Sequence, residues 1–83
     1  MQLTVKYFAS IREAIGQSSE QMDTAATSLA GLRDVLIARG GPYAHSLARG
    51  KTVRMALNQV MCDETTVLTD GAEVAFFPPV TGG

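Results

Sequence analysis

The residues that are best suited to take part in a reaction are the last two of the sequence, Gly82 and Gly83. Neither has a Cβ atom, so the pair can enter a passage too narrow for other residues. The α-carboxylate of Gly83 is ionised at neutral pH and is a poor electrophile, so it must be activated before it reacts. The simplest activated form is an acyl-adenylate made by a separate, ATP-using enzyme. Sulfide or a persulfide would then leave a thiocarboxylate, whereas a lysine would leave an isopeptide.

The residues before the two glycines are suited to hold this terminus away from a folded domain. Pro78 and Pro79 restrict φ and favour an extended polyproline path, and Val80 and Thr81 follow them. The six residues beyond Phe77 span about 20 Å at full extension. We therefore expect a folded domain over residues 1–77 and an extended, flexible tail over residues 78–83.

No other reactive side chain lies in a motif that assigns it a reaction. The sequence has one cysteine, Cys62, and one histidine, His45. A single cysteine excludes an intramolecular disulfide and a zinc site built from several cysteines. A Cys–His pair stays open as an alternative, but we expect a surface histidine and a buried, inert cysteine in a strand. No metal site is predicted.

The tripeptide Gly50-Lys51-Thr52 resembles the end of a phosphate-binding loop, but its context does not fit. That motif needs a glycine five positions before Gly50, where this sequence has His45, and it needs a helix to follow. The next residues instead alternate in polarity as a strand does. We reject this interpretation.

Composition also narrows the classes of partner. The formal net charge is −1 and no basic stripe is present, which argues against nucleic acids and anionic membranes. The longest apolar runs, "VLIA" and "VAFF", are far too short to span a bilayer. We expect one small cytoplasmic domain that binds no cofactor of its own.

Alternating residues predict the strands that must position the tail. Segments 2–9 and 52–58 alternate from one face to the other, while 19–24 is typical of a polar edge strand. Segment 68–77 leads through a turn into a last strand with Val74 and Phe76 on one face. Asn58-Gln59 and Asp70-Gly71 are predicted tight turns, and the first of them leads into 60–62. The residues expected to face the core are Leu3, Val5, Tyr7, Val53, Met55, Leu57, Val60, Cys62, Val74 and Phe76.

Two segments are predicted to be helical. Residues 10–16 favour a short helical turn that ends at Gly16. Residues 28–39 favour a longer helix capped by Thr27 or Ser28 and stopped by glycines and a proline at 40–42. Its apolar face is formed by Leu29, Leu32, Val35 and Leu36.

This order of elements matches the ubiquitin-like β-grasp, an α+β fold with the first and last strands side by side at the centre. One main helix is expected to cover a small mixed sheet, because nothing else is available to bury that face. The same alternation leaves Phe8, Met61 and Phe77 on the solvent side. Three large apolar residues on one small sheet indicate a partner surface, to which Arg12 would add a polar contact.

Several stretches resemble the small subunits of molybdopterin synthase, the sulfur-carrier members of the ubiquitin-like family. "LTDGAEVAFFPPVTGG", residues 68–83, is similar to the C-terminal signature of that family. "YFASIREAIG", residues 7–16, resembles its opening, and "LNQ", residues 57–59, resembles its hairpin. The likeness extends over nearly the whole chain, with residues 18–52 matching by pattern.

The resemblance implies a defined function. Gly83 would be adenylated by a ubiquitin-activating-type adenylyltransferase and then converted to a thiocarboxylate. The tail would enter the active site of a large synthase subunit, in an assembly of two copies of each subunit. There the sulfur would pass to cyclic pyranopterin monophosphate, with ATP and the pterin bound by the partners. The implied site comprises Gly82 and Gly83 for chemistry and, for partner contacts, Phe8, Arg12, Met61, Phe77, Pro78, Pro79, Val80 and Thr81.

Three alternatives remain open from the sequence. A thiazole-forming sulfur carrier shares the fold and the terminal glycines, although the segment "FFPP" argues against it. A protein modifier would use the same terminus to form isopeptides. A simple binding module would leave the tail chemically inert.

Overall fold

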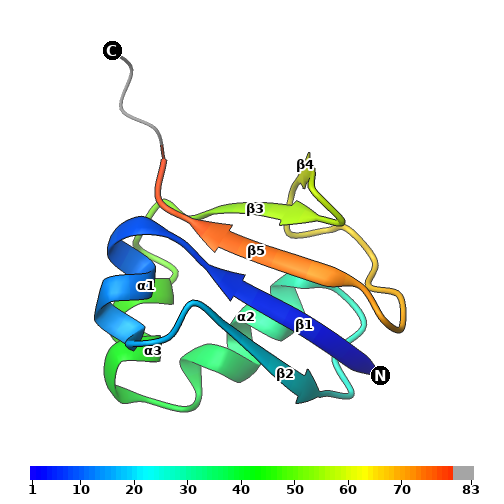
Figure 1. The fold of residues 1–83 in the computed structure, drawn as a ribbon, viewed down its shortest axis with the longest axis horizontal. Helices are drawn as coiled ribbons and strands as arrows, with labels where there is room; N and C mark the ends of the chain where they lie inside the picture. The colour runs from blue at the N-terminus through cyan, green and yellow to red at the C-terminus, as the bar shows by residue number, and fades with distance from the viewer. Residues whose placement is uncertain (80–83) are drawn as a thin grey trace.

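Two parallel strands form the centre of the sheet in the computed structural model, which describes residues 1–79 (Figure 1). The strand order is β2-β1-β5-β3-β4. In chain order the elements are β1 (Gln2–Tyr7), α1 (Ala9–Ile15), β2 (Ser19–Asp23), α2 (Leu29–Ile37), α3 (Gly41–Leu47), β3 (Arg54–Leu57), β4 (Val60–Cys62) and β5 (Glu73–Phe77). This mixed sheet with helices on one side confirms the predicted α+β class. The predictions for Val80, Thr81, Gly82 and Gly83 lie outside the described residues.

The central pair, β1 and β5, is buried on its helix-facing side. Val5 lies opposite Val74, and Tyr7 lies opposite Phe76. All four side chains are almost fully buried, and the Tyr7 and Phe76 rings stack with centroids 6.4 Å apart. The predicted alternation is therefore confirmed here. Because β1 and β3 bond to its two edges, β5 holds the start of the tail in a fixed place.

Helix α2 begins where the sequence predicts. The Ser28 hydroxyl accepts a hydrogen bond from the Gly31 amide at 3.2 Å and so satisfies a free donor of the first turn. Leu29, Leu32 and Leu36 are fully buried under the sheet. The prediction for Val35 was wrong, because its side chain is 40% exposed. A step of about 100° from Leu36 turns Val35 away from the core.

A third helix, α3, was not predicted. The run Gly40-Gly41-Pro42 indicated only the end of a helix, but it also begins the next one. Gly40 adopts a left-handed φ of 76° between α2 and α3, and Pro42 lies in the first turn of α3, where no intrahelical amide bond is lost. Helices α3 and α1 pack together beside the end of β5.

The β3–β4 hairpin corrects two of the burial predictions. Asn58 and Gln59 form the predicted turn, both with left-handed φ angles. Val60, expected in the core, is 66% exposed, and Cys62 is half-buried rather than buried. Strand β4 is the edge strand, and Figure 1 draws it beyond the layer of helices. Alternation therefore predicts correctly to which face of the sheet each β4 side chain points. It does not show that the helices leave Val60 uncovered on that face.

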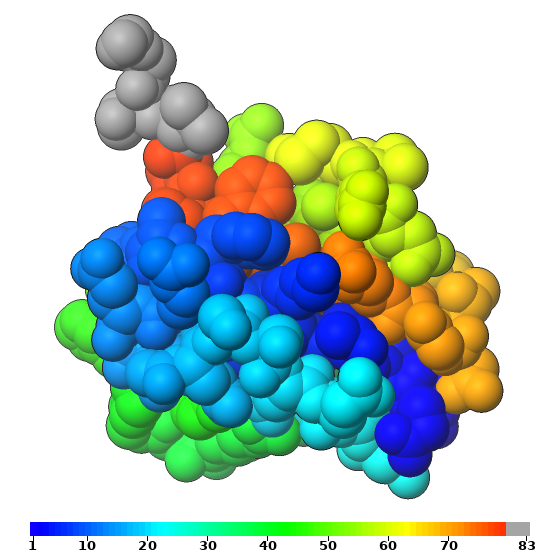
Figure 2. Space-filling model, in the orientation of Figure 1, coloured from blue at the N-terminus to red at the C-terminus, as the bar shows by residue number. Residues whose placement is uncertain are grey.

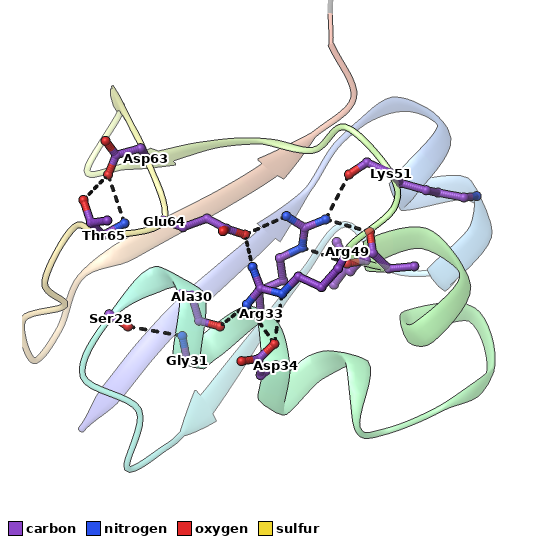
Figure 3. A network of polar contacts seen from close by, with 12 residues as sticks. Ser28, Ala30, Gly31, Arg33, Asp34, Arg49, Lys51, Asp63, Glu64 and Thr65 are labelled. Carbon is purple, nitrogen blue, oxygen red and sulfur yellow. Dashed lines mark hydrogen bonds and ion pairs between the residues drawn. The ribbon is translucent and has the colours of Figure 1, made fainter.

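Buried Arg33 fixes the segment between α3 and β3. Its Nε donates to the Leu47 carbonyl at 2.7 Å, and its Nη2 donates to the carbonyls of Ala48 at 2.8 Å and Lys51 at 3.0 Å. Its Nη1 pairs with Glu64 at 2.7 Å. Figure 3 shows Arg33 and the more exposed Arg49 converging on Glu64. One side chain thus ties residues 47–51 and the β4–β5 connection to α2.

Candidate functional site

The tail leaves the domain at the end of β5. Phe77 is the last ladder residue, opposite Arg54 of β3. Pro78 then ends the strand because it has no amide hydrogen to donate. Pro78 is half-buried and Pro79 is exposed. Since β5 runs parallel to β1, this exit lies at the opposite end of the domain from Met1 (Figure 1).

The sheet face that the helices leave open is hollowed at its centre. Lys6, Ala75, Ala56 and Met61 lie in one row across four strands. The two alanines are small, so they form the floor of a hollow of about 520 Å³ between larger side chains. Figure 2 views this face, with the first and last strands side by side and the β3–β4 hairpin to one side.

Phe8 and Phe77 form an aromatic pair at the tail end of this hollow. Their rings meet edge to face, with centroids 6.4 Å apart and an interplanar angle of 88°. Phe8 is 43% exposed and Met61 is 52% exposed, as predicted. Phe77 lies on the same face but is half-buried, because Phe8 packs against it. Ala9, with a left-handed φ of 51°, turns the chain from β1 into α1 directly after Phe8.

We define the docking face as Phe8, Met61 and Phe77 around the alanine floor. Arg12 lies one helical turn after Phe8, since its amide donates to the Phe8 carbonyl at 3.2 Å. Arg12 is exposed, and its backbone adjoins this face through the bond to Phe8. The structure thus brings together the described residues predicted for partner contacts, and their role stays a prediction.

Arg54 was missed by the sequence reasoning. It lies beside Phe77 in the ladder and lines, with Met61, Phe77 and Pro79, a second hollow of about 260 Å³. Its outward position follows from the alternation of segment 52–58. Its position beside the tail depends on the register of β3 against β5, which the sequence does not reveal.

A polar cluster around Glu20 supports the sheet from the helix side. The Glu20 carboxylate accepts hydrogen bonds from Tyr7 at 2.8 Å, Tyr43 at 3.0 Å and Arg39 at 2.8 Å. Burial, followed by the bond to Glu20, raises the pKa of Tyr7. Burial alone would raise the pKa of Glu20, but the bonds from Arg39, Tyr7 and Tyr43 outweigh it and lower that pKa. The cluster joins β1, β2 and α3.

Cys62 and His45 do not form a reactive pair in the described part of the chain. The Cys62 thiol points to the Met55 carbonyl at 4.0 Å. His45 is exposed in α3, with Nε2 3.4 Å from the Lys51 ammonium nitrogen. Within residues 1–79, no group of three potential metal ligands lies together. No helix in this range is long and apolar enough to cross a membrane.

Known proteins similar to this chain match it along nearly its entire length. The model of the ThiS family matches residues 5–83. The molybdopterin synthase sulfur carrier subunit of Haemophilus influenzae is 37% identical, over 98% of this chain and 99% of the relative. The protein of the same name from Escherichia coli is 38% identical over the same shares.

A solved structure gives the same result for the fold. The complex of subunits 1 and 2 of molybdopterin-converting factor from Helicobacter pylori contains a chain that is 27% identical, with a TM-score of 0.70. The match covers 100% of both chains. Together with the strand order, this likeness confirms the predicted β-grasp architecture. The chain therefore belongs to the ThiS family and, within it, to the molybdopterin synthase sulfur carrier subunits.

Proposed function

We propose that this chain donates sulfur in molybdopterin synthesis and that the C-terminal carbonyl of Gly83 carries the sulfur atom. The observation that carries this proposal is the near full-length identity, 37% and 38%, to two proteins named sulfur carrier subunits of molybdopterin synthase. The relatives' shared name favours molybdopterin over thiazole as the product. It also favours sulfur transfer over the formation of isopeptides.

The chemistry begins with activation of the terminal carboxylate. One carboxylate oxygen attacks the α-phosphate of ATP and displaces pyrophosphate, which forms the acyl-adenylate. Hydrosulfide then attacks the acyl carbon and displaces AMP, which leaves a thiocarboxylate at Gly83. The sulfur of this group is nucleophilic and attacks a side-chain carbon of the pterin precursor, from which an oxygen substituent leaves. Hydrolysis of the acyl–sulfur bond finally returns Gly83 to its carboxylate form.

The geometry supports a reaction inside a partner rather than on this domain. Four residues beyond Pro79 span at most about 14 Å, so Gly83 reaches well beyond the sheet when the chain is extended. We propose that a large synthase subunit holds the pterin and a ubiquitin-activating-type adenylyltransferase holds ATP. This chain would bind no cofactor, would be non-catalytic alone and would act in the cytoplasm. An assembly with two copies of each synthase subunit is part of the proposal.

The docking face supports this arrangement, because it adjoins the exit of the tail. Phe8, Met61 and Phe77 offer apolar contacts within one hollowed surface. Arg12 follows Phe8 by one helical turn, and Pro78 and Pro79 directly follow Phe77. We propose that this surface meets the large subunit while Val80, Thr81 and Gly82 line its channel. Apolar anchors around a central pocket are typical of binding hot spots.

Intact-mass measurement tests the proposed chemistry. The wild-type chain and a chain with one alanine appended after Gly83 are incubated with the adenylyltransferase, ATP and sulfide. We expect the wild type to gain the mass difference of sulfur for oxygen. The extended chain should gain nothing, because its terminus lies about 3.5 Å beyond the reactive position. An unchanged wild-type mass, a conjugate of higher mass, or equal sulfur in both chains would contradict the proposal.

A further inference from the structure

The basic side chains divide into two groups. The sequence has seven lysines and arginines, and Lys6, Arg33, Arg39 and Arg49 each form an ion pair with a carboxylate. The other three are Arg12, Lys51 and Arg54. Within residues 1–79, none of these three has a carboxylate oxygen within ion-pair distance.

Two of these three cations line hollows with the first residues of the tail, and the third follows Phe8 by one helical turn; we call the three the tail-base cations. Arg54 lies beside Phe77 in the ladder and lines a hollow with Pro79. Lys51 and Pro78 line a different hollow, of about 210 Å³, on the helix side. Arg12 follows Phe8 by one helical turn, and the Phe8 ring packs on Phe77. Lys51 and Arg54 therefore lie beside the start of the tail, and Arg12 belongs to the helix that begins directly after Phe8.

The positive charge of the tail-base cations contrasts with the negative net charge of the whole chain. Seven basic and eight acidic residues give a formal net charge of −1. Without the three tail-base cations, four basic and eight acidic residues remain, which is a charge of −4. Glu13 of α1 is next to Arg12 in sequence, and Asp63 and Glu64 line a hollow together with Arg54. Two of the three basic residues that form no ion pair within residues 1–79 thus lie where the tail begins.

The position of the tail-base cations indicates which kind of partner they contact. Gly83 is up to about 14 Å beyond Pro79, so these cations do not contact a reacting group at an extended terminus. Three separate charges do not form the long basic stripe that binding to nucleic acid requires. They are placed to touch the surface of a protein around the opening that the tail enters. Opposite charge on that surface would orient the approaching tail and speed the encounter.

We propose that the tail-base cations dock against a rim of carboxylates on the large synthase subunit, around its opening for the tail. This inference rests on the proposed function. Arg54 lines a hollow with Met61 and Phe77 of the docking face, and Lys51 lines another with Pro78 on the helix side. Arg12 follows Phe8 by one helical turn. The cations therefore set the direction of the tail, and the apolar face supplies the lasting contact.

The test measures association rate constants with the purified large subunit at two salt concentrations. The variants are Arg12→Gln, Lys51→Gln, Arg54→Gln and their triple combination. All three side chains are exposed, so the fold should persist, and melting temperatures check this. Ala25→Glu is the charge control: it makes the same single change in net charge at an exposed site after β2, away from the tail.

At about 0.05 M salt we expect the triple variant to associate about 10-fold more slowly than wild type. Each single variant should be slowed about 2-fold to 3-fold, and Ala25→Glu should resemble wild type. At about 1 M salt, where screening extends over about 3 Å, the rates should converge. A triple variant as fast as wild type at low salt overturns the inference. An Ala25→Glu variant whose association is slowed as much as that of a single Gln variant also overturns the inference. A wild-type chain that does not bind the large subunit at all instead overturns the proposed function.

Discussion

Arg33 and Arg49 both pair with Glu64, but their surroundings make them unequal. The Arg33 side chain is 6% exposed and also serves three backbone carbonyls, whereas the Arg49 side chain is 43% exposed. Arg33→Met should lower the free energy of unfolding by about 3 kcal/mol, because it leaves buried acceptors without donors. Arg49→Met should cost less than about 1 kcal/mol. Urea unfolding measures both, and equal losses would contradict this view of the network.

The individual residues also show where sequence reasoning reaches its limit. Strict alternation predicts the outward side of Phe8 and Met61, because successive strand residues point to opposite faces. It does not predict that the Phe8 ring half-buries Phe77, since that contact joins the two ends of the chain. The same limit applies to Arg54, which becomes a neighbour of the tail only through the β3–β5 register.

At the scale of elements, the docking face should bind a partner without supporting the fold. Phe8→Ala and Met61→Ala remove exposed side chains, so melting temperatures should change little. Affinity for the large subunit should fall about 10-fold or more if these residues are anchors. Val67→Ala is the matched control, because Val67 is 68% exposed in the β4–β5 connection, outside that face. Calorimetry measures the affinities, and an equal loss for Val67→Ala would contradict the assignment.

The elements were predictable where a single local signal decided the outcome. Strand β1 alternates clearly, β5 follows the Asp70-Gly71 turn, and α2 has both a cap and a row of leucines, so each was predicted. Helix α3 was missed because Gly40-Gly41-Pro42 fits the end of one helix and the start of another equally well. The exposure of Val60 was missed because alternation shows the side of a strand but not whether a helix covers it. The prediction for residues 78–83 stays a prediction.

At the scale of the whole molecule, stability should depend on the charge of Glu20. The folded protein holds the pKa of Glu20 below its ordinary value of 4.5. Its contribution is therefore fully present above pH 4.5 and is lost as the pH falls through the lower, folded pKa. Glu20→Gln should lower the free energy of unfolding at pH 7, and the difference from wild type should shrink toward pH 3. Urea unfolding across this range measures that difference, which would stay constant if Glu20 were unimportant as a carboxylate.

The whole molecule has the form of a rigid support for one chain end. The central strand β5 is bonded on both sides, and the docking face adjoins its last residue. Lys51 and Arg54, which form no ion pair within residues 1–79, lie beside Pro78 and Pro79. The apolar surface and the positive charge therefore meet at the end of the domain from which the tail leaves. This concentration is what a carrier requires if its terminus reacts inside another protein.

Sulfur transfer from Gly83 to the pterin tests the central claim most directly. A chain carrying heavy-isotope sulfur at its terminus is mixed with the large subunit and cyclic pyranopterin monophosphate for a single turnover. Mass spectrometry then follows the label in both the chain and the product, with Cys62→Ala as a parallel variant. We predict that the label appears in the dithiolene, that Gly83 returns to a carboxylate, and that Cys62→Ala behaves the same way. Unlabelled product, or a folded Cys62→Ala chain that transfers no sulfur, would contradict the account.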